Sequence, residues 1–242
     1  MSEDVIKCKN CGNQFEGNFC NQCGQKKSVK RFAFTNLSSE FIHGFFHFHK
    51  GLLFTIKELI IRPGSMISEY LEGKRVNYFN PFTYMLLVSI VGGFFHPYSG
   101  LLEHSDRFWL STPEAIEFTR KHFSIRLLIA IPVYGTMSFI FFRKANYNFA
   151  EHLIINAYMI DQIALIFTAF FILLKVYTFS SVGFNIILLS LNAISVVYPL
   201  YLYMQTFKND QVVWRAIKSI IVLICSLFLN FYLVNRIVNF TI

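Results

Sequence analysis

Charged residues are scarce in this 242-residue chain. Asp, Glu, Lys and Arg make up 15% of it, whereas soluble domains average about 25%. Apolar residues make up 54%, and 29 residues are Phe. One globular core cannot bury this much apolar and aromatic surface behind so few charges. The composition therefore argues against a soluble enzyme, a disordered chain and a secreted disulfide scaffold, and it predicts a membrane protein with several spans.

Two further kinds of signal are missing. The first residues hold no apolar stretch of the kind that a secretory signal peptide needs, so we expect membrane entry through the chain's own spans. The sequence also contains no HExxH, GxSxG, P-loop or GxGxxG motif. The lack of a catalytic constellation favours a protein that is not an enzyme.

Basic residues are in excess, with 22 Lys and Arg against 14 Asp and Glu, for a net charge of +8. In a soluble protein this excess would raise nucleic acid as a partner. In a membrane protein, cytoplasmic segments rich in Lys and Arg attracted to anionic headgroups account for it. The expected partner is therefore the lipid bilayer, and nucleic acid is not expected.

Four of the five cysteines form two CxxC pairs near the amino terminus, separated by eight residues: Cys8, Cys11, Cys20 and Cys23. A CxxC turn brings two thiolates to one ion at about 2.3 Å. Four thiolates close a tetrahedral shell, which leaves no open position for catalysis and favours one structural Zn²⁺ per chain. Residues 1–31 are thus predicted to be a zinc ribbon and a basic linker, with Phe15 and Phe19 as nearly all of the ribbon's core.

Two alternatives to the zinc site remain. Two disulfides are one, and they are disfavoured if this end of the chain faces the reducing cytosol. A redox CxxC pair is the other, but such a pair usually accompanies a βαβ pattern that this sequence lacks. The fifth cysteine, Cys225, lies in an apolar run and is expected to be inert.

Residues 32–80 are predicted to form amphipathic helices at the membrane interface. Apolar residues recur on one helical face up to Leu52, and the run 52–61 is too short to span. Glu40, His43 and His47 share a face and are candidate metal ligands. Three ligands make an incomplete shell, so we prefer to interpret them as side chains at headgroup level.

Basic and aromatic residues stand just before the first long apolar run: Arg62, Lys74, Arg75 and Tyr78. Such residues commonly anchor a chain at the interface. A phosphate or lipid-headgroup site is the alternative. Gly73 is a plausible carboxyl-terminal cap for a short helix over residues 66–71.

Residues 81–242 are predicted to be a transmembrane bundle, which makes the chain an all-α polytopic membrane protein with about five transmembrane helices. The apolar runs cover residues 82–95, 127–142, 153–174, 182–203 and 217–234. The first two are shorter than the ~20 residues that a span needs. Either flanking aromatic residues complete them, or one of them does not cross.

The distribution of basic residues predicts the orientation. Sixteen of the 22 Lys and Arg residues lie in residues 1–80, 143–150 and 204–218, and six lie in the other connections and the carboxyl-terminal tail. Cytoplasmic segments carry the excess of Lys and Arg. The amino terminus is therefore predicted to be cytoplasmic and the carboxyl terminus external.

Polar residues inside the spans are expected to mark interior faces. Asp161 is the sharpest case, because a charge there costs about 3 kcal/mol on insertion scales. It could be a proton relay or ion site, or a protonated or paired structural residue. The other polar residues are expected to start a helix or to form interhelical hydrogen bonds: Glu151, His152, Asn185, Asn192 and Asn230.

The order of short motifs resembles a known family. The run CxxC…FCxxCGQ is followed by KGLLFTIKELIIRPG, then EYLEGKR and YFNPF, and then EHL at the start of a later span. This order is similar to that of bacterial zinc-ribbon membrane proteins grouped as domain of unknown function 3667, closely over residues 8–90 and loosely over the spans. The resemblance implies a bacterial inner-membrane protein and supplies no activity.

Three functions follow as hypotheses. The first is a non-enzymatic adaptor or scaffold whose ribbon binds a cytoplasmic protein. The chain is also a candidate for assembly into a homo-oligomer. The second is a small transporter or channel that works through Asp161, Asn185 and Asn192. The third is a membrane enzyme that acts on lipid. It would use Glu151 and His152 together with the basic residues Arg62, Lys74 and Arg75.

Overall fold

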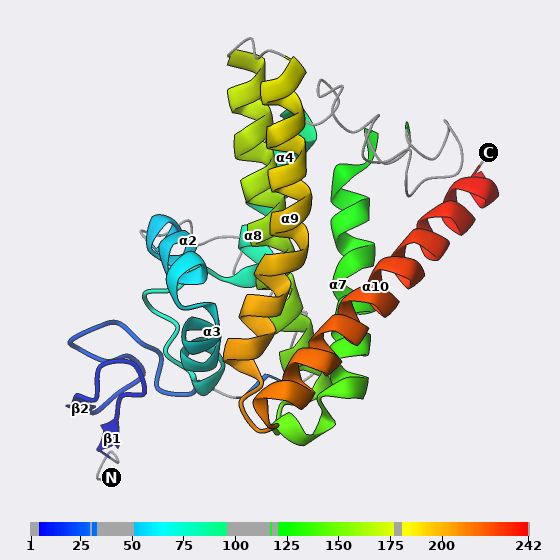
Figure 1. Ribbon diagram of the computed structural model, residues 1–242. Helices are drawn as coiled ribbons and strands as arrows, with labels where there is room; N and C mark the ends of the chain where they lie inside the picture. The colour runs from blue at the N-terminus through cyan, green and yellow to red at the C-terminus, as the bar shows by residue number, and fades with distance from the viewer. Residues whose placement is uncertain are drawn as a thin grey trace.

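The computed structural model describes residues 5–29, 31–32, 51–95, 117, 121–176 and 181–241. In this part of the chain a small two-stranded ribbon precedes a set of helices (Figure 1). The prediction of a mostly helical membrane protein with a small amino-terminal ribbon is therefore confirmed. Glu40, His43 and His47 lie outside the described residues.

The ribbon begins with an antiparallel pair, β1 (Ile6–Lys7) and β2 (Gln14–Phe15). Phe15 is buried with Cys8 and Cys20. Phe19 is 61% exposed, so its predicted place in the core is wrong. The backbone is extended at this point, where Phe19 bridges to Lys26, and successive side chains of an extended segment point to opposite faces. Because Cys20 points inward, its neighbour Phe19 points out.

Two short helices follow at an angle to each other, α2 (Leu52–Ile61) and α3 (Pro63–Glu72). Pro63 opens α3, where its missing N–H costs nothing. Gly73 caps α3 with a φ of 111°, which confirms the predicted cap. The outer face of α2 is apolar and exposed, with Leu53 79% accessible. Its placement at a membrane interface stays a prediction.

Four helices are long and apolar enough to cross a membrane. They are α7 (Phe123–Phe141), α8 (Phe149–Val176), α9 (Ser181–Thr206) and α10 (Val212–Thr241). A short 3₁₀ turn, η3 (Arg143–Ala145), connects α7 to α8. The first predicted run forms α4 (Pro81–Phe95), which is apolar but only 15 residues long. Four candidate spans and one short apolar helix thus stand where about five spans were predicted.

The central helix of the bundle is α8, which packs against α4, α7 and α9. It is the most buried of the four candidate spans, with 61% of its apolar window inside the molecule against 22% for α9. Figure 1 shows α10 leaving the end of α9 and running obliquely alongside α7. The small helix α3 packs on the end of α9, where a Cβ on Gly64 would lie 2.4 Å from the backbone of Gln205.

The ribbon and two of the turns lie at the same end of the bundle (Figure 1). These turns join α7 to α8 and α9 to α10, and they carry Arg143, Lys144 and Lys208. The carboxyl terminus lies at the other end. Among the described residues, the ribbon and these two basic turns therefore lie at one end of the bundle.

Candidate metal centre and its junction with the membrane helices

The four amino-terminal cysteines converge on one point. Their Sγ atoms all lie within 4.8 Å of one another. Cys8 Sγ and Cys23 Sγ are 3.5 Å apart, and Cys11 Sγ and Cys20 Sγ are 3.6 Å apart. A tetrahedron with metal–sulfur bonds of about 2.3 Å has sulfur–sulfur edges of about 3.8 Å, whereas a disulfide bond is about 2.05 Å long. The group is therefore arranged to hold a metal ion.

The same local structure builds both halves of this site. Gly12 N–H donates to Cys8 O at 2.9 Å, and Gly24 N–H donates to Cys20 O at 2.8 Å. Both glycines have positive φ, 78° and 77°, which a residue with a side chain rarely adopts. Cys8 N–H and Cys20 N–H then donate to the carbonyl oxygens of Asn13 and Gln25, each at 2.8 Å. Two equivalent turns thus present two thiols each.

The Cys20 thiol has a lowered pKa. Burial opposes ionisation of Cys20, but hydrogen bonds from the backbone N–H groups of Cys23 and Gln22 and from the Cys11 and Cys23 thiols together outweigh it and lower the pKa of Cys20 to about 6. A thiolate is the form of cysteine that binds metal. The backbone of the second turn thus favours metal binding before any ion arrives.

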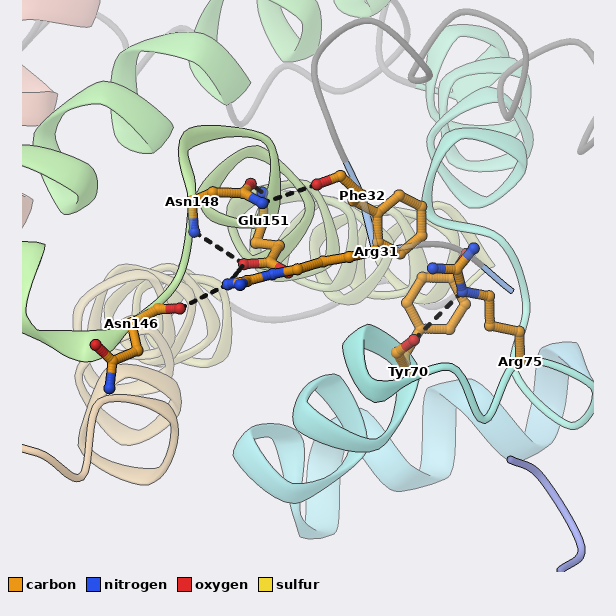
Figure 2. Close-up of polar contacts among 7 residues, drawn as sticks. All are labelled: Arg31, Phe32, Tyr70, Arg75, Asn146, Asn148 and Glu151. Atoms are coloured by element: carbon orange, nitrogen blue, oxygen red, sulfur yellow. Dashed lines mark hydrogen bonds and ion pairs between the residues drawn. The ribbon is translucent and has the colours of Figure 1, made fainter. Parts of the chain in front are cut away.

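The segment after the ribbon is fastened to the start of α8. Arg31 Nε donates to Glu151 Oε1 at 2.7 Å, and Arg31 Nη2 donates to Glu151 Oε2 at 2.8 Å (Figure 2). Arg31 Nη2 also donates to Asn146 O at 2.7 Å. The carboxylate side chain is only 3% exposed, while that of Arg31 is 61% exposed. Such a two-pronged pair is the strongest geometry for an Arg–carboxylate contact.

Glu151 also caps the amino-terminal end of α8. Its Oε2 accepts a hydrogen bond from Asn148 N–H at 2.8 Å, and Asn148 Oδ1 accepts one from Glu151 N–H at 2.9 Å. This reciprocal pair is a capping box at the first turn of α8. Asn148 Nδ2 also donates to Phe32 O at 2.8 Å. The prediction that Glu151 belongs to the helix start thus agrees with the structure.

Phe32 completes the attachment on the other side. It is buried, its ring stacks on that of Tyr70 with centroids 5.7 Å apart, and the Arg75 guanidinium lies 3.7 Å from its ring centroid (Figure 2). Arg75 N–H also meets Gln25 Oε1 of the ribbon at 3.4 Å. We call this set the junction: Arg31, Phe32, Tyr70, Arg75, Asn146, Asn148 and Glu151. It joins the ribbon's end to α3 and α8.

The residues predicted to anchor the chain at the interface, or alternatively to bind a lipid headgroup, are divided between two places. Arg62 makes ion pairs with Glu58 and with Glu69, the latter at 2.9 Å, whereas Arg75 stands in the junction. Tyr78 donates to Glu69 Oε2 at 2.7 Å. This bond and Arg62 lower the pKa of Glu69, while burial and Glu69 raise the pKa of Tyr78 to about 12.

Lys74 also belongs to the region of this cluster, because it lies within electrostatic range of Glu69. The positive charge of Arg62 is balanced by two carboxylates of the protein itself. Arg62 and Tyr78 thus serve as contacts that hold the α2–α3 corner, with Tyr78 buried.

His152 faces a buried polar network that links three helices. Its Nδ1 lies 2.9 Å from Ser138 Oγ of α7, and Asn156 Nδ2 donates to the same oxygen at 2.8 Å. Tyr203 OH of α9 donates to Asn156 Oδ1 at 2.6 Å. The His152 ring stacks on Phe207 with centroids 5.3 Å apart. These contacts give His152 a role in holding α7, α8 and α9 together.

Asp161 is fully buried near the middle of α8. Neither carboxylate oxygen has a hydrogen-bond partner among the described residues. Its neighbour Gln162 accepts a hydrogen bond from Tyr84 OH at 2.7 Å, so α4 is tied to α8 beside it. A carboxyl group in these surroundings is costly when ionised.

The asparagines of α9 do not face the interior of the chain. Asn185 and Asn192 are both exposed, so the expectation that polar residues mark interior faces is wrong for α9. The inward face carries apolar and aromatic residues instead, such as Leu191 and Tyr198. In α10, Asn230 is half-buried, and its Oδ1 has no partner among the described residues.

The Arg31–Glu151 ion pair is a long-range contact that sequence reasoning missed. The two residues are 120 positions apart, and no local pattern joins them. One signal was available: Asn148 three residues before Glu151 is the pattern of a capping box. That pattern indicates where α8 starts, but it does not indicate which distant residue pairs with Glu151.

Comparison with known proteins gives one match. No curated protein and no solved structure matches the chain. The family model described as protein of unknown function, DUF3667, matches residues 50–92. This segment contains α2, α3 and most of α4, including Arg62, Arg75 and Tyr78. The resemblance inferred from the sequence motifs is therefore confirmed over residues 50–92 as a match to DUF3667, a family of unknown function.

Proposed function

We propose that the protein is a non-enzymatic adaptor of the bacterial inner membrane, with a cytoplasmic zinc ribbon that binds a protein partner. The convergence of four thiols carries this proposal. Four protein ligands fill a tetrahedral shell, so the ion has no open position for substrate or water and serves to fold the ribbon.

Zinc and the cytoplasmic side are supported by separate arguments. Thiolate ligands in a tetrahedral set favour Zn²⁺ over harder divalent ions. The ribbon shares its end of the bundle with the basic turns after α7 and α9 (Figure 1), and basic segments favour the cytoplasm. A reducing compartment also keeps free thiols available for the ion.

Phe19 supports a protein partner for the ribbon. It is 61% exposed on a ribbon whose own core consists of a few residues. Exposed aromatic residues are frequent anchors of protein interfaces. The junction holds the ribbon against α3 and α8, so a partner bound there would be held close to the bilayer.

The adaptor proposal can be tested with Phe19→Ala, and with Val5→Ala as its control. Val5 is equally exposed, at 58%, but is not aromatic. We expect one protein to be cross-linked to the wild-type ribbon and to the Val5→Ala variant, but not to the Phe19→Ala or Cys8→Ser variants. Metal content must remain unchanged in Phe19→Ala. Equal cross-linking in all four proteins would contradict the proposal.

Transport through Asp161 is the second candidate function. The observation that favours it is the burial of a carboxyl group without a hydrogen-bond partner among the described residues, near the middle of a span. Ionisable residues at such positions are often proton or ion sites. Proteoliposomes that show a proton or cation flux, lost in Asp161→Asn, would replace the adaptor proposal with this one. Glu151 and His152 have structural partners, so nothing favours the lipid enzyme.

A further inference from the structure

The outer face of α9 carries exposed amide side chains. Asn185, Leu189, Asn192 and Val196 are all exposed, and their spacing of i, i+4, i+7 and i+11 places them on one seam of the helix. Asn185 stands at the edge of the candidate span, and Asn192 lies about 10 Å further along the helix. A bilayer core is about 30 Å thick, so Asn192 is within it.

Asn192 is not satisfied by its own helix. Its Nδ2 donates to Leu188 O at 3.0 Å, which leaves a second N–H and the amide oxygen without a partner among the described residues. Ser190 and Ser195 lie on the same helix and behave differently. Their hydroxyls donate to Ile186 O at 2.8 Å and Asn192 O at 2.7 Å, which uses their single donor. Serine can therefore face lipid at little cost, whereas asparagine keeps unmet hydrogen-bonding groups in hydrocarbon.

We propose that α9 is a self-association face, through which two copies of this chain pair in the membrane by amide hydrogen bonds between their Asn192 side chains. An amide carries both a donor and an acceptor, so two identical amides satisfy each other. A two-fold axis brings each residue of the seam opposite its own counterpart. Leu189 and Val196 then pack on either side of the amide pair, as apolar residues do around a polar seam position. A partner of another sequence would need an amide at the same depth and register, which a second copy supplies automatically.

The proposal can be tested by counting subunits of the full chain in lipid vesicles over a range of protein-to-lipid ratios, using single-molecule photobleaching. We expect the wild type to show a monomer–dimer equilibrium. Asn192→Leu keeps the size and removes the amide, and it should lower the dimerisation constant about tenfold, because two interhelical hydrogen bonds of ordinary strength are lost. Asn192→Gln should retain most of the association.

Ser190→Ala is the matched control, because this residue is exposed on the same helix and its hydroxyl is satisfied internally. It should leave the dimerisation constant unchanged. Metal content and thermal unfolding of each variant show that the fold is intact. A wild type that stays monomeric at every ratio, or an Asn192→Leu variant that dimerises as well as the wild type, would overturn the proposal. A monomeric chain in a one-to-one complex with a different membrane protein would do the same.

Discussion

The ribbon and the helical bundle are held together by different physical means. In the ribbon the buried apolar residues are Cys8, Phe15 and Cys20, with Ile6 and Cys23 packed beside them. A core this small cannot offset the entropy of ordering the ribbon, so we propose that its fold depends on a metal ion bound by the four thiols. The bundle instead buries whole side chains on every helix, and its central helix α8 is buried on most sides. Loss of metal should therefore unfold one region and spare the other.

The two regions meet at the junction, which consists of one ion pair, one pair of stacked rings, one guanidinium–ring contact and a few hydrogen bonds. Most of these contacts are made by Arg31 and Phe32, the two residues that follow the ribbon. Because the junction contains so few contacts, it can be broken while the ribbon and the bundle both stay folded. The four predictions that follow use this difference, beginning with the largest expected effect.

Cys8→Ser should unfold the ribbon completely and leave the bundle in place. Binding of a structural zinc ion supplies on the order of 10 kcal/mol to a small ribbon, and three thiols cannot close the shell. Metal content should fall to near zero, and proteolysis should cut within residues 5–29, while thermal unfolding of the bundle is unchanged. Cys225→Ser, in α10, is the control and should keep the ion. Metal retained in Cys8→Ser would exclude the four-thiol site.

Gly64→Ala should destabilise the bundle and leave the ribbon intact. The added methyl group would lie 2.4 Å from the backbone of Gln205, so α3 must move away from α9. Overpacking of this kind costs about 1–3 kcal/mol. Gly93→Ala is the matched control, because nothing lies within 4 Å of the added carbon and alanine favours a helix. The thermal midpoint in detergent should fall for the first variant and hold or rise for the second.

Arg31→Ala should release the ribbon from α8 while both regions stay folded. We expect the free energy that holds the ribbon to α8 to fall by about 1–2 kcal/mol, because the ion pair has two hydrogen bonds but Arg31 itself is largely exposed. Faster hydrogen exchange at Phe32, with metal content unchanged, would report the release. Arg31→Lys keeps the charge and should restore only part of the effect, because lysine cannot make both bonds. Unchanged exchange in Arg31→Ala would mean that Phe32 and the Arg75–Gln25 contact hold the ribbon without Arg31.

Tyr78→Phe should lower the free energy of unfolding of the bundle by the smallest amount, about 0.5–1.5 kcal/mol, because one hydrogen bond is lost. Because the pKa of Glu69 is lowered in the folded state, its stabilisation is complete above its ordinary pKa of 4.5 and is lost as the pH falls below that value. Without the Tyr78 hydroxyl this pKa rises, so less stability remains to be lost in acid. The measurement is thermal unfolding between pH 6 and pH 3 in the metal-free Cys8→Ser background, so that acid release of zinc does not interfere.

Tyr147→Phe is the control for that series, because its hydroxyl meets Ser68 Oγ at 3.2 Å rather than a carboxylate. Its acid dependence should match that of the parent. Equal acid curves for Tyr78→Phe and the parent would show that the Tyr78 hydroxyl does not lower the pKa of Glu69.

The sequence was sufficient for features that are determined locally. Apolar runs located every candidate span, Gly73 predicted the end of α3, and the CxxC spacing identified the four thiols. The faces of the membrane helices could not be predicted in the same way. Lipid and protein interior are both apolar, so hydropathy does not distinguish the exposed Asn192 from an interior polar residue.

Contacts between distant parts of the chain also escaped prediction. The pairing of Arg31 with Glu151 depends on the arrangement of α3, α7 and α8, which no window of the sequence contains. The exposure of Phe19 depends on the direction of a single side chain next to Cys20. The first feature is decided by tertiary structure, and the second by the local direction of one side chain.

X-ray absorption at the zinc edge, combined with metal analysis of the purified full-length protein, tests the metal centre most directly. We predict one zinc ion per chain, surrounded by four sulfur atoms at about 2.3 Å with no oxygen or nitrogen ligand. Fewer than about 0.1 ions per chain, together with no free thiols at Cys8, Cys11, Cys20 and Cys23 on titration, would show two disulfides instead. That result would contradict both the metal-dependent ribbon and its cytoplasmic location.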